Sequence, residues 1–214
     1  FSFMERHPLL GKYHVHPEIW DEMFGNGDIR FHYKNFVSSI ENLSPEEITR
    51  KDEQAKKLFM TQGVTFTVYS SGEGIEKIFP FDVVPRIITA PEWMHIENGI
   101  KQRLKALNIF LKDIYHQQFI IKDGIIPAKL IYSCPNFLRE MMNVDVPFDI
   151  YTHISGVDLI RDYDGQFYVL EDNLRTPSGV SYMLENRSIT YRIFPDLIPK
   201  NNVLPVKDYP DRLL

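Results

Sequence analysis

Apolar residues recur at helical spacing in two parts of the chain. In the longer part, steps of three and four residues form a single stripe made of Trp93, Ile96, Ile100, Leu104, Leu107, Leu111 and Ile114. This period predicts a helix from about 91 to 116 with one core-facing side. Earlier in the chain, Ser44-Pro45-Glu46-Glu47 has the pattern of a capping box with proline at the first helical position, and Gly63 ends the apolar pattern. We therefore expect another helix over 45–62.

Other segments have the composition of strands and short helices. Strands are predicted where β-branched and aromatic residues dominate, at 65–69, 78–81, 83–88 and 149–155. Short helices are expected at 126–132 and 135–142, and again after residue 180. Because strands and helices are mixed along the chain, we expect an α/β or α+β class. A single domain over 1–214 would then contain helices and short strands in 1–90, helices in 91–148 and a hairpin with its following loop in 149–187.

The composition describes a folded, acidic chain. Its 214 residues are 43% hydrophobic and 25% charged, and 24 Lys and Arg face 29 Asp and Glu, for a net charge of -5. A phosphate-backbone binder needs a cationic stripe, so we expect neither nucleic-acid nor anionic-membrane binding. No apolar run approaches the roughly 18 to 20 residues of a membrane span. The single cysteine, Cys134, is typical of a reducing compartment, and we expect a cytoplasmic protein.

The most informative segment is a predicted hairpin around Asp164-Gly165, a dipeptide typical of two-residue type I′ turns. With this turn, Asp158 lies opposite Glu171, Leu159 lies opposite Leu170, and Asn173 shares a face with Glu171. Opposed carboxylates repel each other unless a cation lies between them or one of them takes up a proton. Carboxylate and amide oxygens without a nearby thiolate suit Mg²⁺ or Mn²⁺. The sequence therefore predicts a metal site.

Two other interpretations of this acidic pair remain open. Acidic residues at a hairpin end are often only solvated, and a longer loop would shift the register by one residue. Carboxylates roughly 5 Å apart also serve as acid and nucleophile in retaining glycosidases. The polar loop that follows favours phosphate over sugar. It leads from Arg175 to Gly179 into a predicted helix, and free N–H groups at a helix start, with Ser178 and Arg175 nearby, attract phosphate oxygens.

At these residues the sequence resembles the ATP-grasp superfamily. In D-alanine ligases and glutathione synthetases, a strand Asp, a Glu on the returning strand and an Asn two residues later bind the two Mg²⁺ ions that bridge the ATP phosphates. Asp158, Glu171 and Asn173 match this pattern in type, order and spacing. More narrowly, four segments resemble the circularly permuted ATP-grasp type 2 proteins of bacteria: residues 62–69, 79–86, 170–180 and 184–187. The resemblance extends from about residue 33 to residue 209.

The resemblance implies a fold and an activity. The expected fold is the N-terminal portion of a circularly permuted ATP-grasp domain, with a mixed sheet and flanking helices, incomplete because family members are longer. The expected activity is an ATP-dependent ligase that joins a carboxylate to an amine through an acyl phosphate, with Mg²⁺ or Mn²⁺. The alternative is an inactive relative that serves as a binding or scaffold module in a peptide synthesis or modification system.

The resemblance also implies roles for residues and partners. Asp158, Glu171 and Asn173 would hold the metal. Arg175 and Arg161 are the candidates for catalysis, and the candidates for ATP contact are Arg175, Thr176, Ser178 and Gly179. A structural ion pair is the alternative role for Arg161, as it is for Arg86. The implied partners are small-molecule or peptide carboxylates and amines, together with an α-helical partner domain.

Overall fold

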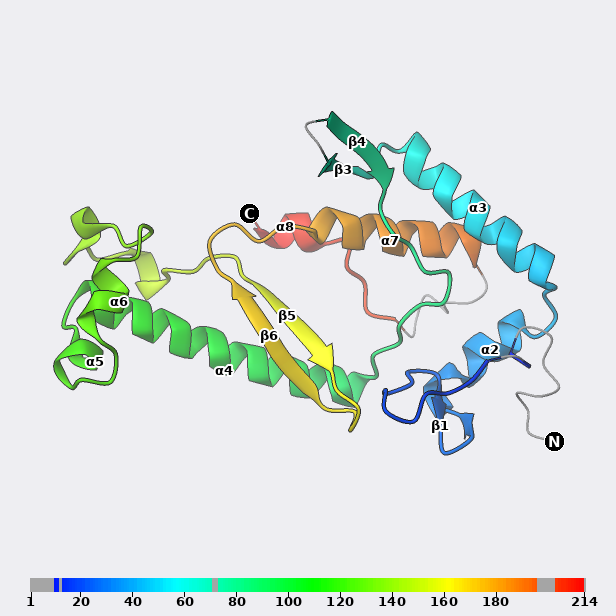
Figure 1. Ribbon diagram of the computed structural model, residues 1–214, viewed down its shortest axis with the longest axis horizontal. Helices are drawn as coiled ribbons and strands as arrows, with labels where there is room; N and C mark the ends of the chain where they lie inside the picture. The colour runs from blue at the N-terminus through cyan, green and yellow to red at the C-terminus, as the bar shows by residue number, and fades with distance from the viewer. Residues whose placement is uncertain (1–9, 12, 71–72, 196–202, 214) are drawn as a thin grey trace. The chain divides into compact units, whose positions relative to one another are not determined.

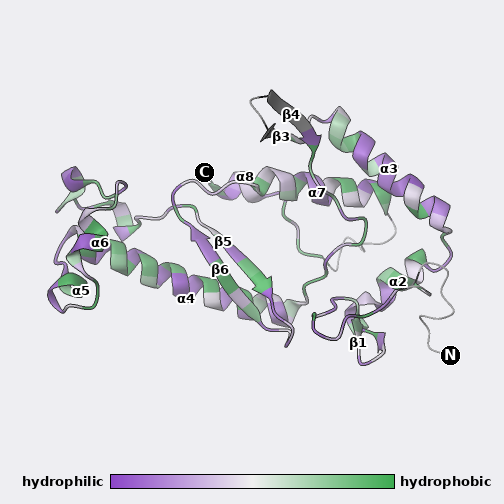
Figure 2. Ribbon diagram, viewed as in Figure 1, coloured by the Kyte–Doolittle hydropathy of each residue, from purple (hydrophilic) through white to green (hydrophobic). Residues whose placement is uncertain are grey.

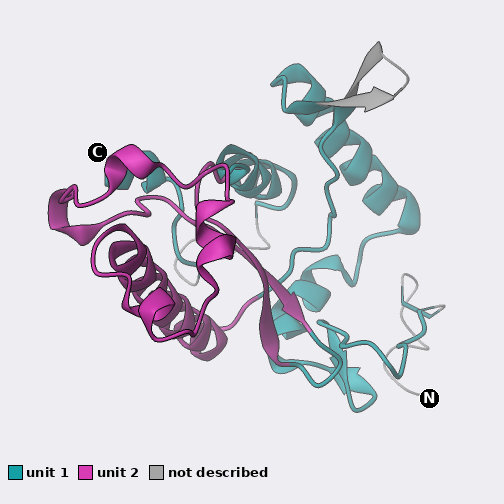
Figure 3. Cartoon of the chain, turned by 60° about the vertical axis from the view of Figure 1, so that its left-hand side comes forward, with its two compact units in different colours: residues 1–87, 162–165, 178–214 teal, residues 88–161, 166–177 magenta. Residues whose placement is uncertain are grey.

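The computed structural model describes residues 10–11, 13–70, 73–195 and 203–213. The chain divides into two compact units, drawn in teal and magenta in Figure 3. Unit 1 comprises residues 1–87, 162–165 and 178–214, and unit 2 comprises residues 88–161 and 166–177. The α+β class is confirmed. The described strands form separate two-stranded antiparallel sheets, and most of the regular structure is helical.

Unit 1 is built around helices from both ends of the sequence (Figure 1). Its elements are β1 (Phe24–Gly25), β2 (Asp28–Ile29), η1 (Phe31–Tyr33), α2 (Lys34–Ile40), α3 (Pro45–Thr61), β3 (Thr65–Ser70), β4 (Glu73–Ile78), α7 (Val180–Ile193) and α8 (Tyr209–Leu213). Its buried core consists of Leu10, Phe24, Tyr33, Phe36, Val37, Ile40, Ala55, Phe59, Ile189, Ile193 and Phe194. Because α2, α3 and α7 share this core, residues about 130 positions apart in sequence pack together.

The predicted helix over 45–62 is confirmed as α3. Its capping box forms on both sides, since the Glu47 N–H donates to the Ser44 hydroxyl at 3.2 Å and the Ser44 N–H donates to the Glu47 carboxylate at 2.8 Å. On its side, the Lys51 ammonium donates to the Ile193 carbonyl at 2.7 Å and lies 4.7 Å from the centre of the Phe194 ring. A cation thus satisfies a carbonyl at the C-terminal end of α7, where the helix dipole favours positive charge.

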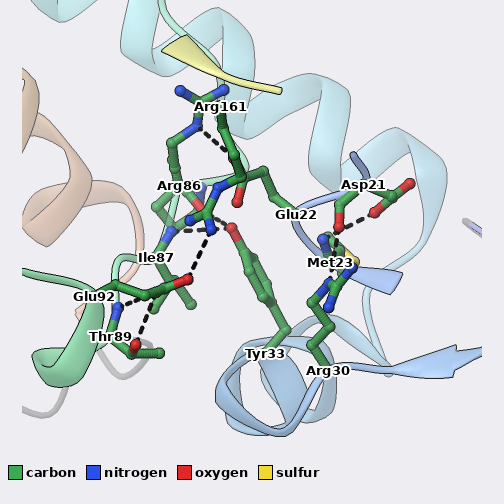
Figure 4. Close-up of polar contacts among 11 residues, drawn as sticks. Asp21, Glu22, Met23, Arg30, Tyr33, Arg86, Ile87, Thr89, Glu92 and Arg161 are labelled. Carbon is green, nitrogen blue, oxygen red and sulfur yellow. Dashed lines mark hydrogen bonds and ion pairs between the residues drawn. The ribbon is translucent and has the colours of Figure 1, made fainter. Parts of the chain in front are cut away.

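The predicted strands over 78–81 and 83–88 are wrong, because β4 ends at Ile78 and residues 79–89 form an irregular segment. Two prolines in this segment have no backbone N–H to give to a partner strand. The backbone of this segment forms hydrogen bonds with a side chain instead of with a partner strand. The Tyr33 hydroxyl donates to the Pro85 carbonyl at 3.1 Å and accepts from the Ile87 N–H at 2.9 Å, and Figure 4 shows Tyr33 reaching Ile87.

Unit 2 consists of one long helix, short helical turns and a hairpin. Its elements are α4 (Ala90–Tyr115), α5 (Phe119–Lys122), α6 (Ala128–Tyr132), η2 (Arg139–Met141), η3 (Pro147–Asp149), β5 (Gly156–Arg161) and β6 (Phe167–Asn173). The predicted helix over 91–116 is confirmed as α4. Hydrophobic and hydrophilic bands alternate along it in Figure 2, and Ile96 and Ile114 are buried. In the part of the chain that the structure describes, no helix is long and apolar enough to cross a bilayer.

Two predicted elements of unit 2 are wrong. The predicted strand at 149–155 lacks regular structure beyond η3, because the side-chain oxygen of Asn108 accepts the N–H groups of Tyr151 and Thr152 at 2.8 and 3.0 Å. The predicted helix at 135–142 shrinks to η2. There the Tyr115 hydroxyl accepts the Leu138 N–H at 3.2 Å. In both places a side chain of α4 occupies a backbone donor that a strand or helix would have used.

Candidate functional site

The turn of the β5–β6 hairpin is longer than predicted. β5 ends at Arg161 and β6 begins at Phe167, so residues 162–166 connect the strands and the predicted two-residue turn is wrong. Within this loop, Gly165 has a φ of +83°, and a Cβ there would lie 2.5 Å from the Trp20 ring. Both the backbone conformation and the lack of space require glycine at this position.

The register of the hairpin nevertheless brings the predicted acidic pair together. Asp158 pairs directly with Glu171, as predicted. Leu159 pairs with Val169, and the prediction that it lies opposite Leu170 is wrong. The longer turn shifts the pairing by one residue, and a β-bulge at Leu170 shifts it back. The two shifts cancel beyond the bulge, which places the carboxylates on adjacent strands with Cβ atoms roughly 4.5 to 5.5 Å apart.

Asp158, Glu171 and Asn173 share one exposed face of the hairpin. Asn173 pairs with Gly156 on β5, and its side-chain amide donates to a Glu171 carboxylate oxygen at 2.9 Å. Within the described residues, neither Asp158 nor Glu171 forms an ion pair with Lys or Arg. A hard divalent cation fits these oxygen donors and would relieve the repulsion between the carboxylates.

The donor set is a sparse one. In the residues that the structure describes, no three His, Cys, Asp or Glu side chains gather closely enough to hold a metal ion. A cation at the hairpin would therefore be held by two carboxylates and one amide oxygen. Mg²⁺ is commonly bound in this way, by one or two carboxylates, while water and substrate phosphate oxygens fill its other positions.

The opposite face of β6 is fastened to α4 by Asp172. The Arg103 guanidinium donates to the Asp172 carboxylate through Nε at 2.8 and 2.9 Å and through Nη2 at 2.6 Å. These hydrogen bonds hold the pKa of Asp172 below its usual value. Sequence reasoning missed Arg103. Its partner, Asp172, is 69 residues away in the sequence. The one available signal was that Asp172 is an acidic residue between Glu171 and Asn173, so its side chain points to the other face of the strand and could pair with a cation there.

Arg161 lies in a buried ion pair at the other end of the hairpin. Its side chain is 4% exposed, its Nη1 lies 2.8 Å from a Glu92 carboxylate oxygen, and its guanidinium carbon lies 4.0 Å from the centre of the Phe167 ring. Glu92 also accepts the Thr89 N–H and hydroxyl at 2.8 and 2.7 Å, and Figure 4 shows these contacts. These contacts favour the structural role that was the alternative for Arg161.

The same contacts change the acidity of Glu92. Burial alone would raise the pKa of Glu92, but the hydrogen bonds from the Thr89 backbone, from Arg161 and from the Thr89 hydroxyl lower it to about 2. The carboxylate is therefore charged at any pH near neutrality and matches the buried guanidinium. Arg86, the other arginine for which ion pairing was the alternative, has its Nε 3.4 Å from a Glu22 carboxylate oxygen.

The predicted ATP-contact residues follow the hairpin. Arg175 and Thr176 are exposed in unit 2, and the Arg175 guanidinium donates to the Asn136 side-chain oxygen at 3.1 Å. Ser178 and Gly179 belong to unit 1, where Gly179 is the N-cap of α7 with a φ of +96° and no side-chain cap. The structure thus gathers the three predicted metal ligands, and it assigns the predicted ATP-contact residues to two different units.

Gly156 is a further residue of the site that sequence reasoning missed. A Cβ there would lie 3.0 Å from the Cβ of Pro177 and 3.7 Å from the Cβ of Asn173. Pro177 therefore packs over the start of β5, on the side where Asn173 points. A glycine at the start of a strand pattern is the sequence signal for such a close approach.

Comparison with known proteins identifies the family. The family model described as circularly permuted ATP-grasp type 2 matches residues 85–214, which include the whole hairpin and α7. The chain belongs to this family. An uncharacterized protein of Synechocystis sp. is 44% identical over 197 residues, which cover 92% of this chain and 41% of that protein. An uncharacterized protein of Mycobacterium tuberculosis is 43% identical over 201 residues, which cover 94% of this chain and 36% of that protein.

A relative with a functional name comes from Frankia casuarinae. It is called "Putative glutamate--cysteine ligase 2-2" and is 36% identical over 208 residues, which cover 94% of this chain and 23% of that protein. This chain thus spans less than half of the length of each of these three relatives. ATP-grasp proteins generally use ATP and Mg²⁺, which agrees with the oxygen donors on the hairpin.

Proposed function

We propose that this protein is an ATP-dependent ligase that joins a carboxylate to an amine, and that the β5–β6 hairpin holds its Mg²⁺ or Mn²⁺. The observation that carries the proposal is the direct pairing of Asp158 with Glu171, with Asn173 on the same face, in a chain of the circularly permuted ATP-grasp family. No nucleophile is required of the protein, because phosphoryl transfer depends mainly on positioning and on neutralisation of charge.

In the proposed reaction, a substrate carboxylate oxygen attacks the γ-phosphorus of ATP, and the bond to the β-phosphate oxygen breaks to release ADP. The amine then attacks the carbonyl carbon of the acyl phosphate, phosphate leaves with the bonding electron pair, and the amine nitrogen loses a proton as the amide forms. Mg²⁺ at the hairpin would supply positive charge to the phosphate oxygens of ATP.

Different residues in and after the hairpin would bind the cation and the phosphate groups of ATP. Asp158 and Glu171 would each supply carboxylate oxygens to the cation, and Asn173 would supply its amide oxygen. The hydrogen bond from the Asn173 amide nitrogen to Glu171 orients the carboxylate while the Asn173 oxygen stays available. Arg175, Thr176, Ser178 and Gly179 would contact phosphate oxygens, which suits exposed polar groups and a helix start without a side-chain cap. These four residues form the proposed nucleotide-contact loop.

The substrate classes are small-molecule or peptide carboxylates and amines. Glutamate and cysteine are the first pair to test, because the Frankia relative carries the name of a ligase for them. The other candidate is an inactive relative that acts as a binding or scaffold module. The intact acidic pair argues against it, because two opposed carboxylates without a cation cost stability and serve no purpose in a module that has lost catalysis.

The proposal is tested by metal binding and by turnover. Mn²⁺ affinity would be measured by electron paramagnetic resonance titration with and without ATP, in the wild-type protein and in Glu171→Gln. We expect at least about a tenfold loss of affinity in Glu171→Gln, because one of two charged ligands is removed. The matched control is Glu97→Gln, which neutralises an exposed carboxylate on α4 that pairs with Lys101 at 2.7 Å. It should bind Mn²⁺ as the wild type does.

Turnover separates the ligase from the inactive module. A ligase should release ADP only when a carboxylic acid and an amine are both supplied, and Glu171→Gln should abolish this release while circular dichroism shows an intact fold. Binding of Mn²⁺ and ATP without ADP release from any acid and amine pair would favour the module. Equal Mn²⁺ affinity in the wild type and in Glu171→Gln would refute the metal site itself.

A further inference from the structure

The hairpin of unit 2 is fastened to α4 at two points. Near the turn, Arg161 pairs with Glu92 at 2.8 Å, and at the open end Asp172 pairs with Arg103 at 2.6 Å. Along α4, residues 92 and 103 are separated by about 16 Å at the helical rise per residue. Along β5, residue 161 and the residue that pairs with Asp172 are separated by about 13 Å. The hairpin therefore runs beside α4, and the two contacts fix which of its faces lies toward the helix (Figure 1).

The two fastenings differ in what they can position. In the β-ladder Arg161 lies opposite Phe167, close to the turn, whereas Asp172 lies between Glu171 and Asn173 on β6. Because side chains alternate along a strand, a contact that holds Asp172 against α4 directs its two neighbours toward the opposite face. The contact between Arg103 and Asp172 is bidentate, and its planar geometry restrains rotation of the strand more than a single hydrogen bond would.

Beyond the β-bulge the ladder consists of three residue pairs, so a side-chain contact to α4 adds to the restraint on this end of β6. A bulge interrupts the ladder, leaves one residue unpaired and increases the local twist of its strand. The bulge at Leu170 lies directly before Glu171, so the hydrogen bonds near the turn do not by themselves fix the direction of the Glu171 side chain. Among the hydrogen bonds and ion pairs of the described residues, the first one beyond the bulge that ties β6 to α4 is the contact between Asp172 and Arg103.

We infer that Arg103 is a positioning residue for the metal site: through Asp172 it keeps Glu171 and Asn173 turned toward Asp158. This inference rests on the proposed function, because it concerns the same metal. Outer partners that orient metal ligands typically change metal affinity by about 10- to 100-fold when they are removed. Arg103 contacts no predicted ligand directly and acts through Asp172 and the backbone, so we expect a loss of Mn²⁺ affinity at the low end of this range, about tenfold.

The test compares Mn²⁺ affinity with stability in the same variants. Mn²⁺ is titrated by electron paramagnetic resonance, and unfolding by guanidinium chloride is followed by circular dichroism. Arg103→Ala should lose about tenfold in Mn²⁺ affinity. Arg103→Lys, which keeps the charge without the bidentate contact, should lie between Arg103→Ala and the wild type. In Arg103→Ala with Asp172→Asn, the second substitution should add little to the first, because the two residues act as one unit.

Two control variants separate positioning from general stability. Glu92→Gln weakens the fastening near the turn and should lower stability while Mn²⁺ affinity stays within about twofold, since the ligands lie beyond the bulge. Lys101→Ala removes an exposed cation two residues from Arg103 on α4 and should change neither quantity.

The outcomes distinguish the two proposals. Failure of the wild-type protein to bind Mn²⁺, with or without ATP, would overturn both the proposed function and the positioning role. If the wild type binds Mn²⁺, Glu171→Gln does not and Arg103→Ala binds normally, the metal site stands and the role of Arg103 is refuted. Equal losses of affinity in Arg103→Ala and Glu92→Gln would also refute it, because both would then act only through the stability of unit 2.

Discussion

Neutralising Glu92 tests whether the buried ion pair stabilises unit 2. The substitution Glu92→Gln keeps a side-chain oxygen that accepts from Thr89, because Gln also serves at the third position of a capping box. It removes the negative charge that faces the guanidinium of Arg161, whose side chain is 4% exposed. The variant therefore isolates the charge of Glu92 from its role as a helix cap.

The magnitude follows from the pKa of Glu92. A fall from the usual 4.5 to about 2 on folding corresponds to a stabilisation of about 3 kcal/mol by the ionised carboxylate. The Glu92 side chain is 27% exposed, so solvent screening makes this value an upper bound. Because the pKa is lowered in the folded state, the stabilisation is complete above pH 4.5 and is lost as the pH falls from 4.5 toward 2.

The assay is guanidinium chloride unfolding of the wild type and Glu92→Gln, followed by circular dichroism at pH 6 and at pH 3. At pH 6 the wild type should be more stable by up to about 3 kcal/mol. Between pH 6 and pH 3 the wild type should lose up to about 2 kcal/mol more than the variant, which has no carboxylate to protonate. Parallel losses in the two proteins over this pH range would show that the charge of Glu92 does not stabilise the fold.

Two further substitutions test contacts of unit 1. Tyr33→Phe should lower the free energy of unfolding by about 1–3 kcal/mol, because it leaves the N–H of Ile87 without its 2.9 Å acceptor in a partly buried site, and thermal unfolding measures the loss. Lys51→Met should lower the free energy of unfolding by about 1–2 kcal/mol, because it removes the 2.7 Å hydrogen bond to the Ile193 carbonyl. The control Lys56→Met breaks only an exposed ion pair within α3 and should lower it by less than about 0.5 kcal/mol. Equal effects of the two lysine substitutions would contradict the role assigned to Lys51.

The sequence by itself determined the elements whose signals are local. The bounds of α3 follow from a capping box and those of α4 from apolar residues at helical spacing, and each signal lies within the helix that it predicts or directly beside it. The pairing of Asp158 with Glu171 was also predictable, since it depends on strand alternation around one turn. That prediction was right for the acidic pair only because the bulge cancels the effect of the longer turn.

The tertiary structure decided the features whose partners are distant in sequence. Residues 149–155 are not a strand because Asn108, 43 positions before Tyr151, accepts its N–H. Arg161 lies in a buried ion pair with a residue 69 positions away, and Arg103 reaches Asp172 over the same separation. The physical reason is the same in each case. A backbone or charged group forms its hydrogen bond or ion pair with whichever group lies beside it in the folded chain. The hydrophobic period or motif of a short segment contains no information about a partner that is distant in sequence.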